Sequence, residues 1–60
     1  MLNKKVWNDQ TMATETIISE FNYGTYQEIE MSNGSVAFTR KSDSRFIDNE
    51  TGAEWRLING

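Results

Sequence analysis

The sequence predicts a small all-β protein, an antiparallel meander of four or five strands with an N-terminal arm or short helix. An SH3-like barrel is the alternative in which the same sheet curls on itself. Two turn signals support this prediction. Asn33-Gly34 and a loop ending at Gly52 each separate short runs rich in apolar and aromatic residues, and such residues supply the positive φ that hairpin loops require. Proline is absent, so it interrupts no strand.

The central hairpin is expected to join residues 26–31 to residues 36–41 through a two-residue type I′ turn at Asn33-Gly34. This register sets Ile29 opposite Phe38 on the core face, and it leaves Glu28 and Glu30 on the other face. A slip of one residue would lose that segregation of apolar from acidic side chains. We therefore expect Phe38 in the core.

The segment before this hairpin has two interpretations. As a strand, residues 16–22 pair with residues 25–31, and Ile18 meets Ile29 on the core face. As a helix over residues 11–21, the segment would align Ala13, Ile17 and Phe21 at i, i+4 spacing. Its threonines and isoleucines have restricted χ1 angles and favour the strand.

The last hairpin is predicted to pair residues 45–48 with residues 53–58 across a four-residue loop. Phe46 then faces Trp55, a cross-strand aromatic pair. A three-residue loop would set Asp48 against Glu54, two like charges, so the longer loop is preferred. The chosen register has one unfavourable consequence, because Arg45 lies opposite Arg56.

The 60 residues are expected to form a single domain, with Leu2, Val6 and Trp7 covering an open face of the sheet. Met12-Ala13 resembles a natural start of translation, so residues 1–11 are alternatively an optional arm. A domain of this size has a small core, and oligomerisation or partner binding would supplement it. We find no internal repeat.

Composition excludes several kinds of chemistry. The chain has no cysteine and no histidine, which removes disulfides and makes zinc or haem sites very unlikely. Calcium-loop, phosphate-loop and dinucleotide motifs are absent, so we expect no metal and no cofactor. The Ser and Thr hydroxyls have no imidazole and no Ser-x-x-Lys spacing to activate them. We therefore predict no enzymatic activity.

Hydropathy and charge argue against a membrane span or a secretory signal. No apolar run approaches the roughly 20 residues of a membrane span. The segment that follows Lys4 and Lys5 lacks the apolar stretch of a signal peptide. The default location is the cytoplasm.

Charge is distributed unevenly, and this asymmetry suggests a binding face. Residues 6–39 contain no Lys or Arg although they hold five acids. Aromatic side chains at the centre of a patch with acids at its rim are typical of protein-binding surfaces. The residues predicted to bind a protein partner, or a second copy of the chain, are Trp7, Phe21, Tyr26, Glu28 and Glu30. Size and composition resemble accessory proteins of phages and mobile elements, whose targets are host proteins.

A small nucleic-acid-binding β-barrel is the alternative function. The residues that would bind phosphate are Arg40, Lys41, Arg45 and Arg56, clustered near Phe46 and Trp55. The opposition of Arg45 and Arg56 favours an anion between them, unless nearby acids neutralise the pair. A net charge of −3 repels phosphate at long range, so nucleic acid is the less favoured partner.

Overall fold

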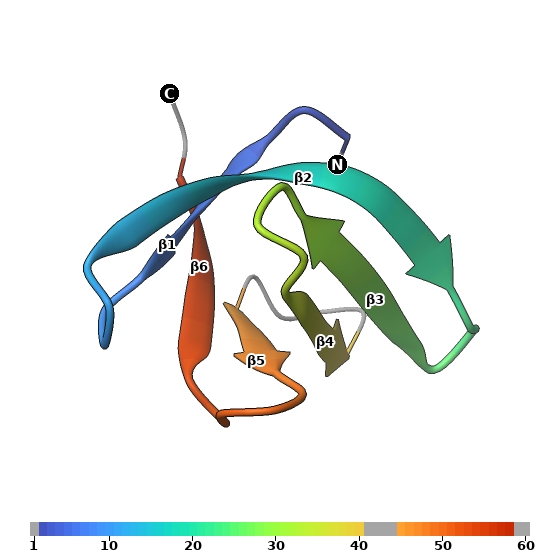
Figure 1. The fold of residues 1–60 in the computed structure, drawn as a ribbon. Helices are drawn as coiled ribbons and strands as arrows, with labels where there is room; N and C mark the ends of the chain where they lie inside the picture. Colours follow the sequence, from blue (N-terminus) through green and yellow to red (C-terminus); the bar gives the residue numbers. More distant parts are fainter. Residues whose placement is uncertain (1, 41–44, 59–60) are drawn as a thin grey trace.

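The structure is a computed structural model that describes residues 2–40 and 45–58, and it contains a closed barrel of six antiparallel strands (Figure 1). The strands are β1 (Lys5–Asn8), β2 (Ala13–Asn22), β3 (Tyr26–Met31), β4 (Val36–Arg40), β5 (Arg45–Asp48) and β6 (Glu54–Ile58). Each strand pairs with the next, and β1 pairs with β6 to close the barrel. The all-β prediction is confirmed, with more strands than expected. The segment that had a helical alternative forms β2.

The N-terminal segment is a strand of the barrel rather than an optional arm. β1 pairs with β2 on one side and with β6 on the other. Val6 is fully buried, whereas Leu2 is largely exposed and does not cover a sheet face. Pairing on both sides removes the unpaired edges that an open sheet would leave at β2 and β6.

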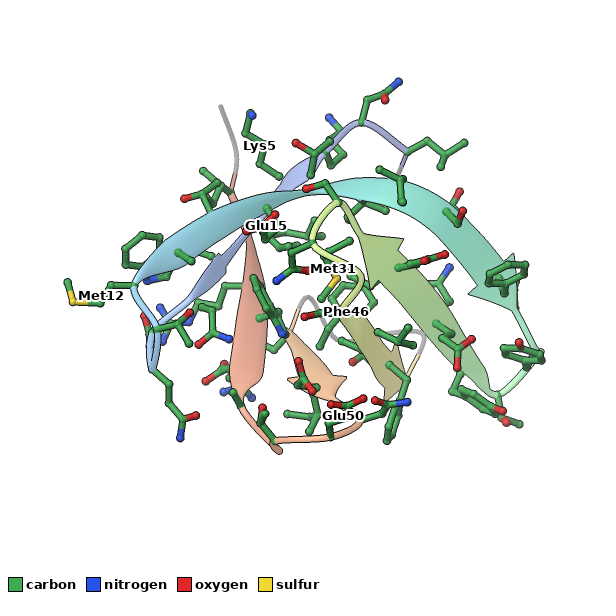
Figure 2. All side chains as sticks on the ribbon, viewed as in Figure 1. Lys5, Met12, Glu15, Met31, Phe46 and Glu50 are labelled. Carbon is green, nitrogen blue, oxygen red and sulfur yellow. The ribbon has the colours of Figure 1, made fainter. Side chains whose placement is uncertain are left out.

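The core lies inside the barrel, and every strand contributes to it (Figure 2). Its buried members are Val6, Ile17, Ile29, Met31, Ala37, Phe46 and Trp55. Two large rings share this interior with small side chains such as Ala37 and Ala53. Small barrels commonly combine large and small residues in this way, because their interior volume is limited.

The turn between β3 and β4 differs from the predicted type I′ turn. The Gly34 N–H donates to the Met31 carbonyl at 2.9 Å, and the Met31 N–H donates to the Ser35 carbonyl at 2.8 Å. Gly34 has a φ of 91°, but Asn33 is not among the residues with positive φ. This pattern is a type I turn followed by a glycine bulge, which makes a three-residue loop.

The extra loop residue shifts the β3–β4 register by one. Ile29 lies opposite Ala37 rather than Phe38. Since successive side chains of a strand point to opposite faces, the shift turns the whole of β4 over. Ala37 is fully buried and Phe38 is 42% exposed. The expectation that Phe38 belongs to the core is wrong.

β2 also enters the barrel in a different register from the predicted one. A β-bulge between Ile17 and Ser19 interrupts its pairing with β3, and Glu20 rather than Ile18 lies opposite Ile29. Ile17 is fully buried and Ile18 is 50% exposed. The bulge bends the long strand over the barrel, and it exchanges the two isoleucines between core and surface.

The β5–β6 hairpin has the predicted register. Phe46 lies opposite Trp55, and Arg45 lies opposite Arg56. Both rings are buried. The Asp48 N–H donates to the Ala53 carbonyl at 2.8 Å, which places residues 49–52 in the loop as expected.

The loops of the β1–β2 and β5–β6 hairpins are built alike, a local repeat that inspection of the sequence missed. The side chain of the residue just before each loop accepts hydrogen bonds from backbone N–H groups two and three residues later. The acceptor is Asn8 Oδ1 for Gln10 (2.9 Å) and Thr11 (3.2 Å), and Asp48 Oδ1 for Glu50 (2.8 Å) and Thr51 (3.1 Å). Each loop ends on a residue of positive φ, Met12 at 56° and Gly52 at 74°. The shared pattern reads Asn8–Ala13 as NDQTMA and Asp48–Ala53 as DNETGA.

Candidate functional site

The outer face of β2, β3 and β4 carries a contiguous group of aromatic side chains. We call Phe21, Tyr23, Tyr26 and Phe38 the aromatic row. The strand registers produce it: Phe21 lies opposite Glu28, and Glu28 lies opposite Phe38 on the next strand. Side chains that face each other across paired strands lie on the same side of a sheet. Glu28 therefore stands between the two phenylalanines.

Ring contacts connect all four members of the row. Tyr23 and Tyr26 stack, with centroids 4.9 Å apart and an interplanar angle of 22°. Phe21 lies 6.5 Å from Tyr23, and Phe38 meets Tyr26 edge-on at 6.3 Å. The four residues are each between 39% and 52% exposed. These contacts order the rings against one another while their remaining surface faces solvent.

The β2–β3 loop brings the two tyrosines together. Tyr23 and Tyr26 flank Gly24-Thr25, and the Tyr23 N–H donates to the Tyr26 carbonyl at 2.9 Å. The Gly24 N–H in turn donates to Asn22 Oδ1 at 2.9 Å. A short, hydrogen-bonded loop thus holds the phenol rings in contact.

Glu28 makes the row electrically negative at its centre. The Tyr23 hydroxyl donates to Glu28 Oε1 at 3.4 Å. Desolvation in the row, followed by the negative charge of Glu28, raises the pKa of the Tyr23 phenol above its usual value. Glu30 lies further along β3, opposite Ser19 on β2 and Val36 on β4. Two carboxylates therefore share the outer face of β3 with the aromatic rings.

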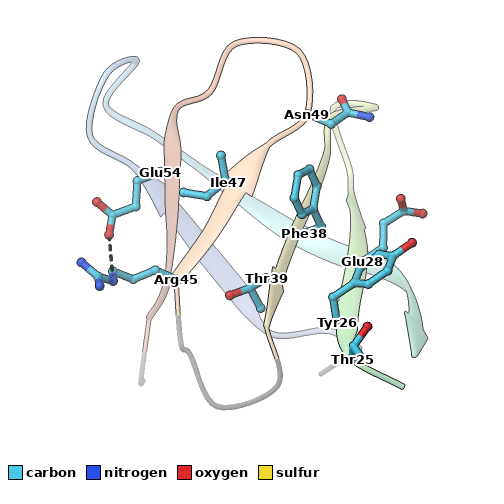
Figure 3. Close-up of a pocket in the computed structure, with 9 residues that line it drawn as sticks. All are labelled: Thr25, Tyr26, Glu28, Phe38, Thr39, Arg45, Ile47, Asn49 and Glu54. Atoms are coloured by element: carbon cyan, nitrogen blue, oxygen red, sulfur yellow. Dashed lines mark ion pairs between the residues drawn. The ribbon is translucent and has the colours of Figure 1, made fainter. Parts of the chain in front are cut away.

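An open groove continues from the row across the barrel surface (Figure 3). Tyr26 and Glu28 form one wall, and Phe38 and Ile47 form an apolar floor. The other wall is the side chain of Glu54, which is ion-paired to Arg45. Phe38 and Ile47 lie opposite each other on β4 and β5, and each is 42% exposed.

The opposed arginines of β5 and β6 are neutralised from within the chain. Glu54 Oε2 lies 3.4 Å from the Nε of Arg45 and 3.6 Å from the Nε of Arg56. A second carboxylate, Asp9, lies 3.9 Å from a terminal nitrogen of Arg56. The like-charge opposition that suggested an external anion is thus balanced by acidic side chains.

The predicted anion site has two further residues, Arg40 and Lys41. Arg40 occupies β4 opposite Tyr26, and Lys41 lies outside the described residues. The rings expected beside the cations, Phe46 and Trp55, are buried. They are not available as a stacking platform for bases.

Of the residues predicted to bind a partner, the structure groups Phe21, Tyr26, Glu28 and Glu30 on one face. Trp7 is placed elsewhere: it lies on β1 opposite Arg56 and Thr14. Its indole N–H donates to Asp9 Oδ1 at 2.6 Å. Trp7 is therefore not part of the aromatic row.

Sequence reasoning missed Tyr23 and Phe38. Tyr23 lies between the two predicted strands, and a tyrosine on each side of a short glycine-containing loop is a signal that the two rings can meet. Phe38 was assigned to the core because the β3–β4 loop was taken as one residue shorter. The correct loop length would have identified Phe38.

The described residues contain no group of side chains that could hold a metal ion, and none of their segments is a helix with the length and hydropathy of a membrane span. Comparison with protein-family models, with curated proteins and with solved structures gives no match.

Proposed function

We propose that this protein is a non-enzymatic interaction module that binds another protein through the aromatic row and the carboxylates of β3. The observation that supports this most directly is the row itself. Contiguous aromatic rings ordered by mutual contact, yet 39–52% exposed, are typical of interface anchors. Charged residues in such a patch add selectivity and a faster encounter.

A different protein is a better partner for this face than a second copy of the chain. In a two-fold symmetric dimer, the same patch of both copies would meet itself. Glu28 and Glu30 of each copy would then enter an interface that already contains the same two acids. Like charges juxtaposed across an interface are unfavourable, so a basic or neutral surface fits better.

Binding of single-stranded nucleic acid is the second candidate, and the exposed stacked rings favour it. Bases stack on such rings with little dependence on sequence. The charges around the row oppose it, because phosphate contacts supply most of the affinity in such complexes. Arg45 and Arg56 are already ion-paired with Glu54. We propose protein binding as the function, within the cytoplasm, in an accessory protein of a phage or mobile element.

Two double variants test the choice. Glu28→Lys with Glu30→Lys should abolish capture of a specific protein from lysate of the source cell, whereas Arg45→Ser with Arg56→Ser should retain it. Both variants need a melting curve, because the second pair removes the cations that contact Glu54. The same proteins are titrated with a single-stranded oligonucleotide in low salt. Oligonucleotide binding that the arginine change abolishes and the acid reversal leaves intact would replace protein binding with the nucleic-acid function.

A further inference from the structure

Glu28 has an unusual position for a surface acid. It stands between Phe21 and Phe38 across the paired strands, and its carboxylate accepts a hydrogen bond from the Tyr23 hydroxyl. No cationic side chain pairs with it among the side chains that the structure describes. The surroundings of Glu28 thus combine a negative charge with the faces and edges of several rings.

We propose that this face binds an arginine side chain carried by a basic segment of the partner. This inference rests on the proposed function and states the chemistry of the partner. A guanidinium is planar and weakly hydrated, stacks on aromatic rings, and pairs with a carboxylate through two parallel hydrogen bonds. Glu28 supplies the carboxylate, and Tyr26 and Phe38 supply the rings.

The groove beside Glu28 matches the rest of an arginine-bearing segment. Its floor, Phe38 and Ile47, is apolar and provides surface for the aliphatic stem of the side chain. Its far wall is Glu54, held by Arg45. A peptide lying along this groove would keep the charged head at Glu28 and its methylene groups over the floor.

The charge of the surrounding face favours a cation. Two carboxylates occupy outer positions of β3. They are Glu28 and Glu30, whereas Arg45, which also lines the groove, is ion-paired to Glu54. The 33 residues before Arg40 contain no Lys or Arg.

The experiment compares three short capped peptides with alternating glycine. They carry arginine, lysine, or citrulline, which keeps the planar shape of arginine without its charge. Each is titrated into the ¹⁵N-labelled protein in low salt, and amide chemical shifts report both affinity and location. We expect the arginine peptide to bind about threefold more tightly than the lysine peptide and about tenfold more tightly than the citrulline peptide. Shifts should concentrate on residues 21–28 and on Phe38.

Variants assign the binding to individual side chains. Glu28→Gln should weaken the arginine peptide about tenfold, to the level of citrulline. Tyr26→Leu should weaken it about threefold and reduce the advantage of arginine over lysine. Glu50→Gln, a matched change at an exposed acid of the β5–β6 loop, should leave the affinity unchanged.

Equal affinity for the arginine and citrulline peptides would overturn the proposal, as would shifts that map to Asp9 or Glu50 instead of the row. Absence of binding at millimolar peptide would also overturn it. The proposed function has a separate readout. A partner lost with Phe21→Ser but retained with Glu28→Gln would leave protein binding standing and refute arginine recognition. Tighter binding of a single-stranded oligonucleotide than of the arginine peptide would refute both.

Discussion

Alanine substitutions at two phenylalanines, Phe46 and Phe38, should separate stability from binding. The first should mainly lower stability, and the second should mainly weaken binding. Phe46 is fully buried and is among the largest fully buried side chains. Truncation of a buried phenylalanine to alanine typically costs about 3–5 kcal/mol. A domain of 60 residues has a total stability of about 3–9 kcal/mol, from about 0.05–0.15 kcal/mol per residue. Phe46→Ala should therefore unfold much of the population at 25 °C.

Phe38→Ala should leave the fold largely intact. The side chain is 42% exposed, and its ring meets Tyr26 edge-on. Such a contact contributes about 0.5–1.5 kcal/mol beyond the buried area. We expect a total loss of about 1–2 kcal/mol, together with weaker binding of whatever occupies the aromatic row.

Urea titration followed by circular dichroism and by tryptophan fluorescence measures both changes, because Trp55 is buried opposite Phe46. Phe46→Leu serves as a milder variant if the alanine variant cannot be purified. Equal destabilisation by Phe38→Ala and Phe46→Ala would refute the reasoning. It would mean that β4 turns Phe38 inward, as the two-residue turn predicts.

Three further predictions concern the loops and the first strand. Burial raises the pKa of Asp48, but hydrogen bonds from Glu50, the Trp55 indole and Thr51 outweigh burial and lower the pKa overall. The stability that ionised Asp48 contributes is therefore complete above the unfolded pKa of about 3.9. This stability is lost as the pH falls through the lower pKa of the folded state. Asp48→Asn should cost about 1–3 kcal/mol at pH 7, and denaturant melts should show this difference shrinking toward pH 3; a constant difference would contradict the assignment. Met12→Gly should raise the free energy of unfolding and Gly52→Ala should lower it, by about 1 kcal/mol each, since both positions have positive φ and Gly52 has no atom near a new Cβ. Urea titration measures both changes, and no change in either would mean that the backbone relaxes. A chain that starts at Met12 should be unfolded, because it lacks β1 and the buried Val6, and circular dichroism measures this. If the truncated chain folds, residues 1–11 are an optional arm instead of an essential strand.

The part of the fold that sequence reasoning predicted in detail is the β5–β6 hairpin. Its register followed from one electrostatic argument, the avoidance of Asp48 opposite Glu54, and from the pairing of Phe46 with Trp55. Both arguments are local, because the two strands are joined by a short loop. The opposition of Arg45 and Arg56 looked like a defect, and the structure resolves it with Glu54 on the same strand as Arg56.

The closing strand was not predictable from local patterns. Residues 5–8 show one buried apolar side chain, Val6, and their partners on β6 lie about fifty residues later. Nothing in a short segment reveals so distant a pairing. The same holds for the bulge in β2, because two consecutive isoleucines, Ile17 and Ile18, fit a core position equally well until the pairing with β3 is known.

Whether Phe38 joins the aromatic row depends on the length of the β3–β4 loop, which differs by one residue between prediction and structure. Asn33-Gly34 is compatible with a two-residue type I′ turn and also with the three-residue loop that the structure contains. In the first case Phe38 would join Phe46 and Trp55 inside the barrel. In the second, Ala37 occupies the interior position. Interior volume favours the second, since a six-stranded barrel that already holds two large rings accommodates alanine at the next position more easily than a third ring.

The same geometry explains why the aromatic row and the barrel core are separable. With the longer turn, Phe38 leaves the core and meets Tyr26 on the surface, which completes the aromatic row. With Phe38 outward, Glu28 gains an aromatic neighbour on both sides, whereas Glu54 is held between two arginines. The two glutamates thus have different electrostatic roles. Glu54 neutralises the chain's own cations, and Glu28 lies among rings, where the proposed guanidinium of a partner would pair with it.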